Sequence, residues 1–545
     1  MNEPIDYRAR PYCCGALGPA DPERIRRLLA DAPEGLSAAF EGPGAVLYTT
    51  GAAETWEAGP RRGLHWSPLA PGSGPTAWQD AAERRLAAGL QTEPVPLLHT
   101  DALGLNDVYY RELDGAVYFA SRIGGLLGLD DAPLHIGWDA WAATLAFHAP
   151  AADDTPFREV KRLRAAGALV VDDGRVASES FEPAWLADAG DGEPSPGEVA
   201  AAVAEAIPAA PEGAVTLSGG WDSRLLGILA KQRIDQVRAW TTSGDDGHDR
   251  DMRYAGPVAE ALGVKHRTLV PGPDAWVEEH AAVRDRMEFQ TGLHTWMMPL
   301  ARNLHRHERT LVDGLAGDVM FKSSLVGGKL ADETDGARRE YLLWKALEQR
   351  RLRTDRMLLP AVRDRFAEAA RSRLGEAVAP FIGHRAGAML GVLHVRTARA
   401  VAASGRWLLG PELDVRFPFA HPEVLRLAIR VPTAEKLGGV FYRRMLYAAD
   451  PDVAALPSTN DGARLGARRG RRQTSPESLR TVASYVRAAE PLMALLTPTA
   501  RRAVKDPDAL ALLASGMGGM RTLSWAGLFG HWLERHQDRL TIDEP

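Results

Sequence analysis

The chain has 545 residues, of which 45% are hydrophobic and 25% are charged, and its formal net charge is -6. This length exceeds that of one ordinary domain, and the composition is typical of globular proteins, which excludes disordered and fibrous classes. The small net charge argues against a general binder of nucleic acids or membrane surfaces.

The only two cysteines, Cys13 and Cys14, are adjacent, which excludes a disulfide framework and a four-cysteine zinc site. The first residues lack the basic and then apolar run of a secretory signal, and no stretch approaches the ~20 apolar residues that span a bilayer. We therefore expect a soluble cytoplasmic protein with no membrane partner and no nucleic-acid partner.

The first part of the chain, up to about residue 190, has short strand-like runs separated by glycine and proline. Two hairpins are expected there, because Asp114-Gly115 and Asp173-Gly174 are favoured two-residue turns between alternating strands. Residues 186–200 are rich in Gly, Pro and Asp and poor in large apolar residues, which predicts a linker.

After the linker, helical stretches alternate with short apolar strands, predicted at 214–218, 237–242, 266–270 and 309–314. Strands separated by helices pair in parallel through crossover connections. A doubly wound α/β layer is therefore expected, followed by a largely helical region from about residue 336.

The strongest local signal is the run VTLSGGWDSRLLGILAKQ, an apolar strand that turns through small residues into an amphipathic helix. Ser218, Gly219 and Gly220 would leave backbone N–H groups open at a helix N-terminus, which favours a phosphate group. Asp222 would be repelled by a triphosphate unless it holds Mg²⁺ that bridges the phosphate oxygens, while Ser223 can add a hydroxyl donor. The alternative interpretation is a Ser/Asp helix cap after a glycine turn.

The SGGWDS motif resembles the SGGxDS loop of the ATP-pyrophosphatase superfamily, and further segments, in the expected order, resemble its asparagine-synthetase-like branch. Residues 312–321 resemble the second Gly-rich loop with its metal-binding aspartate, here Asp318, and residues 411–432 resemble the segment in which an acidic residue and an arginine precede Pro-Phe. Strand-like segments in the N-terminal half resemble the glutaminase-like domain of the same family.

This resemblance implies a C-terminal α/β domain over 196–545, with a doubly wound parallel sheet of the adenine-nucleotide alpha-hydrolase type. It also implies an N-terminal α+β sandwich over 1–190 of the glutaminase-like Ntn type. The implied cofactors are ATP and Mg²⁺, with the metal held by Asp222 and Asp318. The residues expected to contact ATP are Leu217, Ser218, Gly219, Gly220, Asp222, Ser223, Thr242, Gly314 and Gly317.

The family pattern is broken where glutamine-dependent members carry an N-terminal cysteine nucleophile. Residues 14–18 echo the usual Cys-Gly-Ile-x-Gly opening, so removal of a 13-residue propeptide is one interpretation. The Arg-Gly and Asn-Gly patterns of a glutamine pocket are not recognisable between residues 20 and 100. We therefore interpret the cysteine pair as a packing element and the N-terminal domain as a retired glutaminase.

Loss of the glutaminase makes the chain closest in type to β-lactam synthetases and lasso-peptide cyclases. The implied reaction activates a small-molecule or peptide carboxylate as an acyl-adenylate, releases pyrophosphate and lets an amine displace AMP. A precursor peptide and its processing protease are the implied partners. The alternatives are an asparagine synthetase that uses glutamine or ammonia, and a catalytically retired nucleotide-binding protein.

The general base is not evident, because Leu315 stands where relatives carry tyrosine or glutamate. Glu288 is the predicted base, with an exposed helix charge as its alternative role. Lys436 and Arg443 are the candidates for the late cation that stabilises developing charge. The arginines between residues 464 and 472 indicate a solvated loop or, alternatively, a flap over ATP or an acidic peptide.

Overall fold

The computed structural model describes most of the chain. The described residues are 5–66, 77–84, 87–187, 190–243, 250–272, 274–322, 325–348, 352, 355–460, 475–514 and 519–543. Within this part of the chain, every helix is too short or too polar to cross a lipid bilayer. The arginine-rich stretch at 464–472 lies outside the described residues, so its predicted flap stays a prediction.

The N-terminal half contains two antiparallel six-stranded sheets that face each other. The first sheet has the order β11 (Lys161–Arg162), β8 (Tyr109–Leu113), β9 (Ala116–Ala120), β1 (Cys13–Leu17), β3 (Ala45–Thr49) and β2 (Ser37–Gly42). The second has the order β13 (Arg175–Ser180), β12 (Gly167–Asp172), β7 (Leu97–His99), β6 (Ala88–Glu93), β5 (Arg61–Trp66) and β4 (Glu54–Ala58). Apolar side chains of both sheets, among them Leu47 and Leu90, form the core between them.

Both predicted hairpins are present, as β8–β9 and β12–β13. Asp114 and Gly115 have φ values of 52° and 78°, and Asp173 and Gly174 have 45° and 70°. Two consecutive positive φ values match the twist of hairpin strands, which explains the Asp-Gly sequence. The sandwich agrees with the predicted sheet-rich domain, and its assignment to the Ntn type stays a prediction.

The C-terminal half is built on a five-stranded parallel sheet. Its order is β16 (Lys265–Leu269), β15 (Ile234–Thr242), β14 (Ala210–Thr216), β17 (Thr310–Val312) and β18 (Asp414–Arg416). All four pairings are parallel, which confirms the predicted α/β layer. The order reverses direction at β14, and open sheets bind ligands beside the strand ends at such a point. The sequence pattern missed β18, because three residues carry no readable periodicity.

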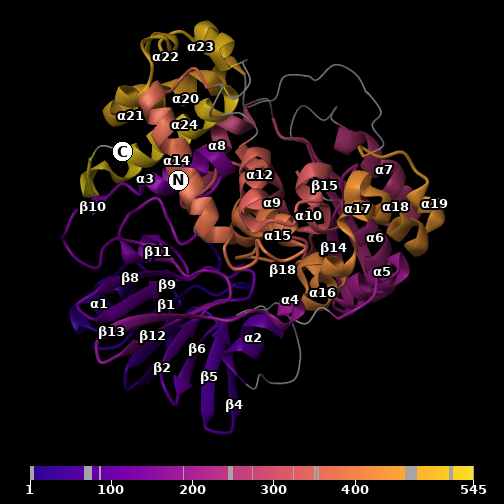
Figure 1. The fold of residues 1–545 in the computed structure, drawn as a ribbon, viewed down its shortest axis with the longest axis horizontal. Coiled ribbons are helices and arrows are strands. Elements are labelled where there is room, and N and C mark those ends of the chain that lie inside the picture. The colour runs from indigo at the N-terminus through magenta and orange to yellow at the C-terminus, as the bar shows by residue number, and fades with distance from the viewer. Residues whose placement is uncertain are drawn as a thin grey trace.

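Helices surround the parallel sheet and continue beyond it (Figure 1). Those between its strands are α6 (Trp221–Arg233), α7 (Arg250–Leu262), α8 (Ala275–Arg286), α9 (Met298–Leu304), α10 (Gly317–Lys322), α11 (Gly328–Ala331), α12 (Gly336–Glu348), α14 (Pro360–Val378), α15 (Gly387–Val392) and the π-helical η3 (Leu393–Val401) and η4 (Ser404–Leu409). Those after β18 are α16 (Pro422–Arg430), α17 (Thr433–Lys436), α18 (Val440–Ala449), α19 (Pro451–Ala454), α20 (Pro476–Ala488), α21 (Glu490–Leu495), α22 (Pro498–Ala503), α23 (Pro507–Ala514) and α24 (Gly519–His536).

The predicted linker separates the two sheets in the sequence. The predicted range of 186–200 is too wide, because helix α4 (Ala184–Ala187) covers its start and helix α5 (Pro196–Glu205) covers its end. Helix α5 begins with a capping box, in which the side chains of Ser195 and Glu198 each accept a hydrogen bond from the backbone N–H of the other residue. Serine before proline and glutamate three residues later are a common helix start. Helix α5 then packs on α6 and α18, beside the parallel sheet. The domain boundary itself stays a prediction.

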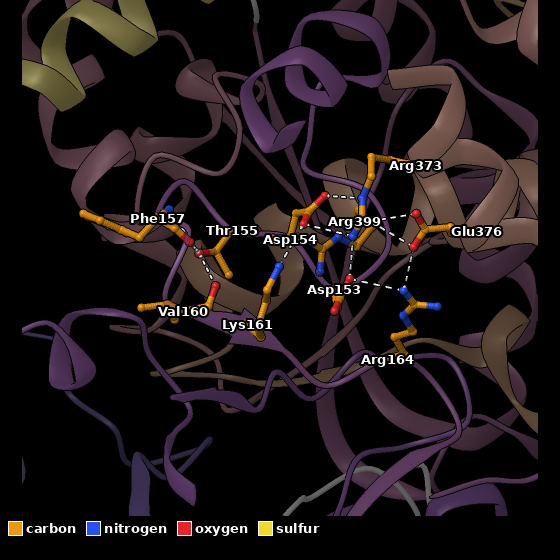
Figure 2. A network of polar contacts seen from close by, with 10 residues as sticks. All are labelled: Asp153, Asp154, Thr155, Phe157, Val160, Lys161, Arg164, Arg373, Glu376 and Arg399. Carbon is orange, nitrogen blue, oxygen red and sulfur yellow. Dashed lines mark hydrogen bonds and ion pairs between the residues drawn. The ribbon is translucent and has the colours of Figure 1, made fainter. Parts of the chain in front are cut away.

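The two halves are joined by a buried interface. Helix α3 (Trp138–Phe147) of the N-terminal half packs against α14 and α24, and its Trp141 ring lies 5.2 Å from that of Trp532. Figure 2 shows Arg373 of α14 reaching two carboxylates of the N-terminal half, with Nη2 2.6 Å from Asp153 and Nε 2.6 Å from Asp154. Apolar packing and ion pairs therefore hold the sandwich against the helical region.

Candidate functional site

The first Gly-rich loop lies between β14 and α6, at the carboxyl end of the central strand. Gly220 is the N-cap residue, with φ of -84° and ψ of 168°, and neither Ser218 nor Asp222 occupies that position. The alternative interpretation as a Ser/Asp helix cap is therefore wrong. The N-terminus of α6 therefore lies at the carboxyl end of β14, the position at which helices commonly bind anions.

The loop's own N–H groups are bonded to protein acceptors, which corrects the expectation that they are open. Buried N–H groups without a ligand need such acceptors. The bonds run from Ser218 N to Ser223 Oγ at 2.9 Å, from Gly219 N to Asp251 Oδ1 at 2.8 Å, from Gly220 N to Ser218 Oγ at 3.2 Å, and from Trp221 N to Asn460 Oδ1 at 3.0 Å. These contacts set the loop's shape, and a phosphate that used the same N–H groups would have to replace their acceptors.

The second Gly-rich loop packs directly against Asp222. A Cβ atom at Gly317 would lie 2.9 Å from Asp222 Oδ1, and one at Gly314 would lie 3.3 Å from Asp222 Cβ. Both glycines are therefore needed for the close approach of the two loops. The sequence predicted close approach to a nucleotide, whereas the structure shows close approach to the first loop's aspartate.

The two predicted metal-binding carboxylates lie together, and a lysine bridges them. Lys322 Nζ, at the end of α10, is 2.9 Å from Asp222 Oδ2 and 3.2 Å from Asp318 Oδ1. Asp318 and Lys322 are four residues apart, so they share one face of the helix. The sequence analysis did not single out Lys322, although this spacing from Asp318 is visible in the sequence.

The charges in this cluster act on one another. Burial raises the pKa of Asp222 and the Lys322 ammonium opposes the rise. Burial lowers the pKa of Lys322, but the carboxylates of Asp222 and Asp318 outweigh it and leave that pKa raised. Burial is the main cause that raises the pKa of Tyr442 well above its ordinary value, and the nearby Asp222 carboxylate is the second cause. Lys322 is therefore a cation and Tyr442 a neutral phenol at neutral pH.

The donor set fits a hard divalent cation. Asp222 Oδ1 is buried and makes no hydrogen bond of ordinary geometry among the described residues, although the Tyr442 hydroxyl is near enough to lower the pKa of Asp222. A buried oxygen of this kind costs free energy unless a ligand binds there. The side chain of Asp318 is 49% exposed and can turn toward the same point. Two carboxylates with an open oxygen suit Mg²⁺, which keeps several water or phosphate ligands of its own.

Arg443 lies beside the first loop, because its guanidinium carbon is 5.3 Å from the centre of the Trp221 ring, and Trp221 opens α6. Thr242 ends β15, beside β14, and its buried hydroxyl has no partner in the described part of the chain. Leu217 is a buried extension of the sheet, with its N–H donated to Trp240 O at 2.8 Å. All three predicted residues thus lie at or beside the carboxyl ends of the strands.

Two predicted catalytic residues lie elsewhere. Lys436 is fully buried and its ammonium donates to the carbonyl of Ala428 at 2.5 Å. Burial, helped by Arg385, lowers the pKa of Lys436 to about 7. The charged end of Lys436 points into the helical core, so these contacts do not support its role as the late cation, which stays a prediction.

Glu288 lies at the interface with the N-terminal half. Its Oε1 accepts a hydrogen bond from Gly124 N at 2.8 Å, and its Oε2 is 3.4 Å from Arg122 Nε. Glu288 and Phe289 both have positive φ values, 48° and 58°, which turns the chain toward that half after α8. These contacts indicate the structural role that was the alternative for Glu288, and its role as the general base stays a prediction.

Asp313 is a carboxyl group that the sequence analysis missed. It follows β17, in the second Gly-rich loop, and its Oδ1 accepts a hydrogen bond from Leu315 N at 2.9 Å. Burial raises the pKa of Asp313 to about 6, against the opposing effect of that N–H. A carboxylate with such a pKa can take up a proton near neutral pH. The motif at residues 312–321 contains Asp313 but did not single it out, because its raised pKa comes mainly from burial in the fold.

Both cysteines are buried in β1 and form no disulfide. Cys14 pairs with Tyr48 on one side and Ala120 on the other, so it lies in the middle of a sheet. Burial raises the pKa of the Cys14 thiol to about 12, although Tyr12 opposes the rise. These observations agree with a packing role for the cysteine pair.

The comparison with protein families agrees with this geometry. Residues 197–452, which contain both Gly-rich loops and the parallel sheet, match the family model described as asparagine synthase. A search of curated proteins finds no match to the chain. Residues 197–452 therefore form an asparagine synthetase-like domain.

Proposed function

We propose that this chain is an ATP-dependent amide-forming synthetase, which activates a substrate carboxylate as an acyl-adenylate and then transfers the acyl group to an amine. One observation supports it most. Two Gly-rich loops at the carboxyl ends of parallel strands bring Asp222 and Asp318 to the same lysine, with a buried carboxylate oxygen left open. The match of residues 197–452 to the asparagine synthase family supports the same class of reaction.

In the first step, a substrate carboxylate oxygen bonds to the α-phosphorus of ATP, and the bond from that phosphorus to pyrophosphate breaks. Asp222 and Asp318 would hold Mg²⁺, which when bound supplies positive charge to the phosphate oxygens. The N-terminus of α6 and the Arg443 guanidinium, which lies over the Trp221 ring at that end of the helix, would bind phosphate charge. Positioning and charge neutralisation therefore contribute most of the rate.

In the second step, an amine bonds to the acyl carbon, the bond to AMP breaks and the amine loses a proton. Asp313 is our candidate for the acceptor of this proton, because it lies in the second loop and its pKa is about 6. Leu315, two residues later, cannot perform this role, since its side chain accepts no proton.

We further propose that the reaction belongs to peptide or natural-product biosynthesis, such as the closure of a macrolactam in a lasso peptide. A precursor peptide and its processing protease would then be partners. The buried, strand-paired Cys14 supports this choice over a glutamine-dependent asparagine synthetase, because a glutaminase nucleophile must be exposed at an N-terminus. An ammonia-dependent asparagine synthetase and a retired nucleotide-binding protein are the other candidates.

The test combines nucleotide binding with pyrophosphate release. The purified chain should bind α,β-methylene-ATP in the presence of Mg²⁺, and it should release pyrophosphate from ATP with a peptide carrying a free amine and a free carboxylate. Release with aspartate and ammonium instead would favour an asparagine synthetase. A protein that binds no nucleotide and releases no pyrophosphate with any of these substrates would be a retired member of the family.

A further inference from the structure

Lys322 already bridges the two carboxylates that would hold a metal ion. Its ammonium lies between the two carboxylates, 2.9 Å from Asp222 Oδ2 and 3.2 Å from Asp318 Oδ1, where a divalent cation would also bind. Its side chain is only 9% exposed, so solvent screens these contacts weakly. Lys322 and a metal ion therefore compete for the same pair of carboxylates.

The lysine has a place to move when a metal arrives. Its Nζ already lies 5.2 Å from the centre of the Tyr442 ring, which offers a neutral face for a cation. Four methylene groups let the ammonium swing while the α10 backbone stays fixed. A metal ion bound close by would repel it, whereas the triphosphate that accompanies the metal would attract it.

We propose that Lys322 is a built-in counter-ion of the metal site, which holds Asp222 and Asp318 together before nucleotide binds and turns to the triphosphate when Mg²⁺ and ATP bind. This inference rests on the proposed function. It assigns Lys322 the cationic role that the contacts of Lys436 do not support. It also makes binding ordered, because the carboxylates bind metal weakly until a triphosphate draws the ammonium away.

The experiment measures metal binding without nucleotide. Mn²⁺ titrations followed by electron paramagnetic resonance would compare the full-length protein with Lys322→Met, Lys322→Arg and Lys329→Met. Removal of the ammonium should tighten Mn²⁺ binding at least about tenfold, which equals about 1.4 kcal/mol. Lys322→Arg keeps the charge and should bind Mn²⁺ as weakly as the unmodified protein. Lys329, on the exposed face of α11, is the matched control and should change nothing.

A second titration measures the other half of the proposal. Lys322→Met should bind α,β-methylene-ATP with Mg²⁺ at least about tenfold more weakly than the unmodified protein, because one phosphate-binding cation is lost. The same variant should therefore gain affinity for metal alone and lose affinity for metal with nucleotide. A purely structural lysine would not produce these opposite changes. If Lys322→Met does not fold, Lys322→Gln replaces it with the same expectations.

The outcomes separate this inference from the proposed function. Unchanged Mn²⁺ affinity in Lys322→Met, together with lost Mn²⁺ binding in Asp222→Asn and Asp318→Asn, would overturn the role of Lys322 and leave the metal site standing. Unchanged Mn²⁺ binding in both aspartate variants would instead remove the metal site itself. Opposite shifts in the two titrations would support the counter-ion.

Discussion

Two buried clusters in this molecule both pair carboxylates with cationic side chains, but they differ in whether every carboxylate oxygen has a partner. At the domain interface, one oxygen of Asp107 accepts a hydrogen bond from Arg162 Nε at 2.7 Å. Its other oxygen accepts hydrogen bonds from Arg406 Nη1 at 2.7 Å and Trp407 Nε1 at 3.0 Å. At the Gly-rich loops, Lys322 binds two carboxylates, and one oxygen of Asp222 has no partner among the described residues.

The difference between the two clusters shows which charged residues hold the fold together and which are available to bind a ligand. Both oxygens of Asp107 are satisfied and its partners are themselves buried, so the cluster holds the two halves of the chain together. In the loop cluster, one oxygen of Asp222 has no partner among the described residues, so there is room for a ligand that carries positive charge. Each prediction below tests one side of this contrast.

The largest effect is expected from Asp107→Ala. Burial favours the neutral acid, but Arg406 and Arg162 outweigh it and hold the pKa of Asp107 well below its ordinary range. Removal of this carboxylate leaves two arginines buried without their charge partner, which costs about 3–5 kcal/mol of stability. Chemical denaturation at pH 7 measures the loss, and metal binding by the protein that remains folded should be unchanged.

The control for Asp107→Ala is Asp131→Ala. Asp131 pairs with Arg27 at 2.8 Å, but its side chain is 90% exposed. Exposed pairs contribute little, so this variant should unfold at the same denaturant concentration as the unmodified protein. Equal losses in the two variants would contradict the role given to the interface cluster.

Asp222→Asn and Asp318→Asn test the other cluster. Either change should lower pyrophosphate formation at least ~100-fold, a rise of about 2.7 kcal/mol in the barrier, because the metal loses a charged ligand. The fold should stay intact, as circular dichroism would show, since asparagine has nearly the shape of aspartate. Near-normal turnover in both variants would refute the assignment of the site.

Asp313→Asn should make the protein more stable at pH 7 and not at pH 4. The pKa of Asp313 is about 6 in the folded protein and ~3.9 in an unfolded chain, so the folded state binds the proton more tightly. Stability therefore falls as pH rises from ~4 to ~6, and the cost persists above that range. The variant should recover about 1–2 kcal/mol at pH 7, since partial exposure screens the charge.

The measurement is unfolding by urea at both pH values. In a substrate-saturated assay, the same variant should also lose the decrease in amide formation below pH ~6, because the proton acceptor is gone. A stability difference that is equal at pH 4 and pH 7 would show that Asp313 ionises normally.

The smallest effect is expected from thiol labelling. Cys13 and Cys14 are buried, and burial raises the pKa of Cys14 to about 12, so neither thiol should react with a disulfide reagent in the native protein at pH 8. Both should react after denaturation in guanidinium. Rapid labelling of Cys14 in the folded protein would revive the glutaminase interpretation.

Local signals predicted much of the fold. The Asp-Gly turns marked both hairpins, and apolar runs between helical stretches marked the parallel strands, because turn chemistry and periodicity act over a few residues. The short strand β18 escaped, since its position is decided by pairing with β17 and not by its own three residues.

The sequence by itself determined the two Gly-rich loops, the two acids and the resemblance to the asparagine-synthetase-like branch, because each loop depends on spacing within its own strand–turn–helix unit. Only the tertiary structure decided which cations meet them. In the folded chain, Lys436 lies in the helical core, Glu288 lies at the domain interface and Lys322 lies between Asp222 and Asp318. Charge partners far apart in sequence are chosen by how helices pack and which groups become buried, and that information is spread over the whole chain.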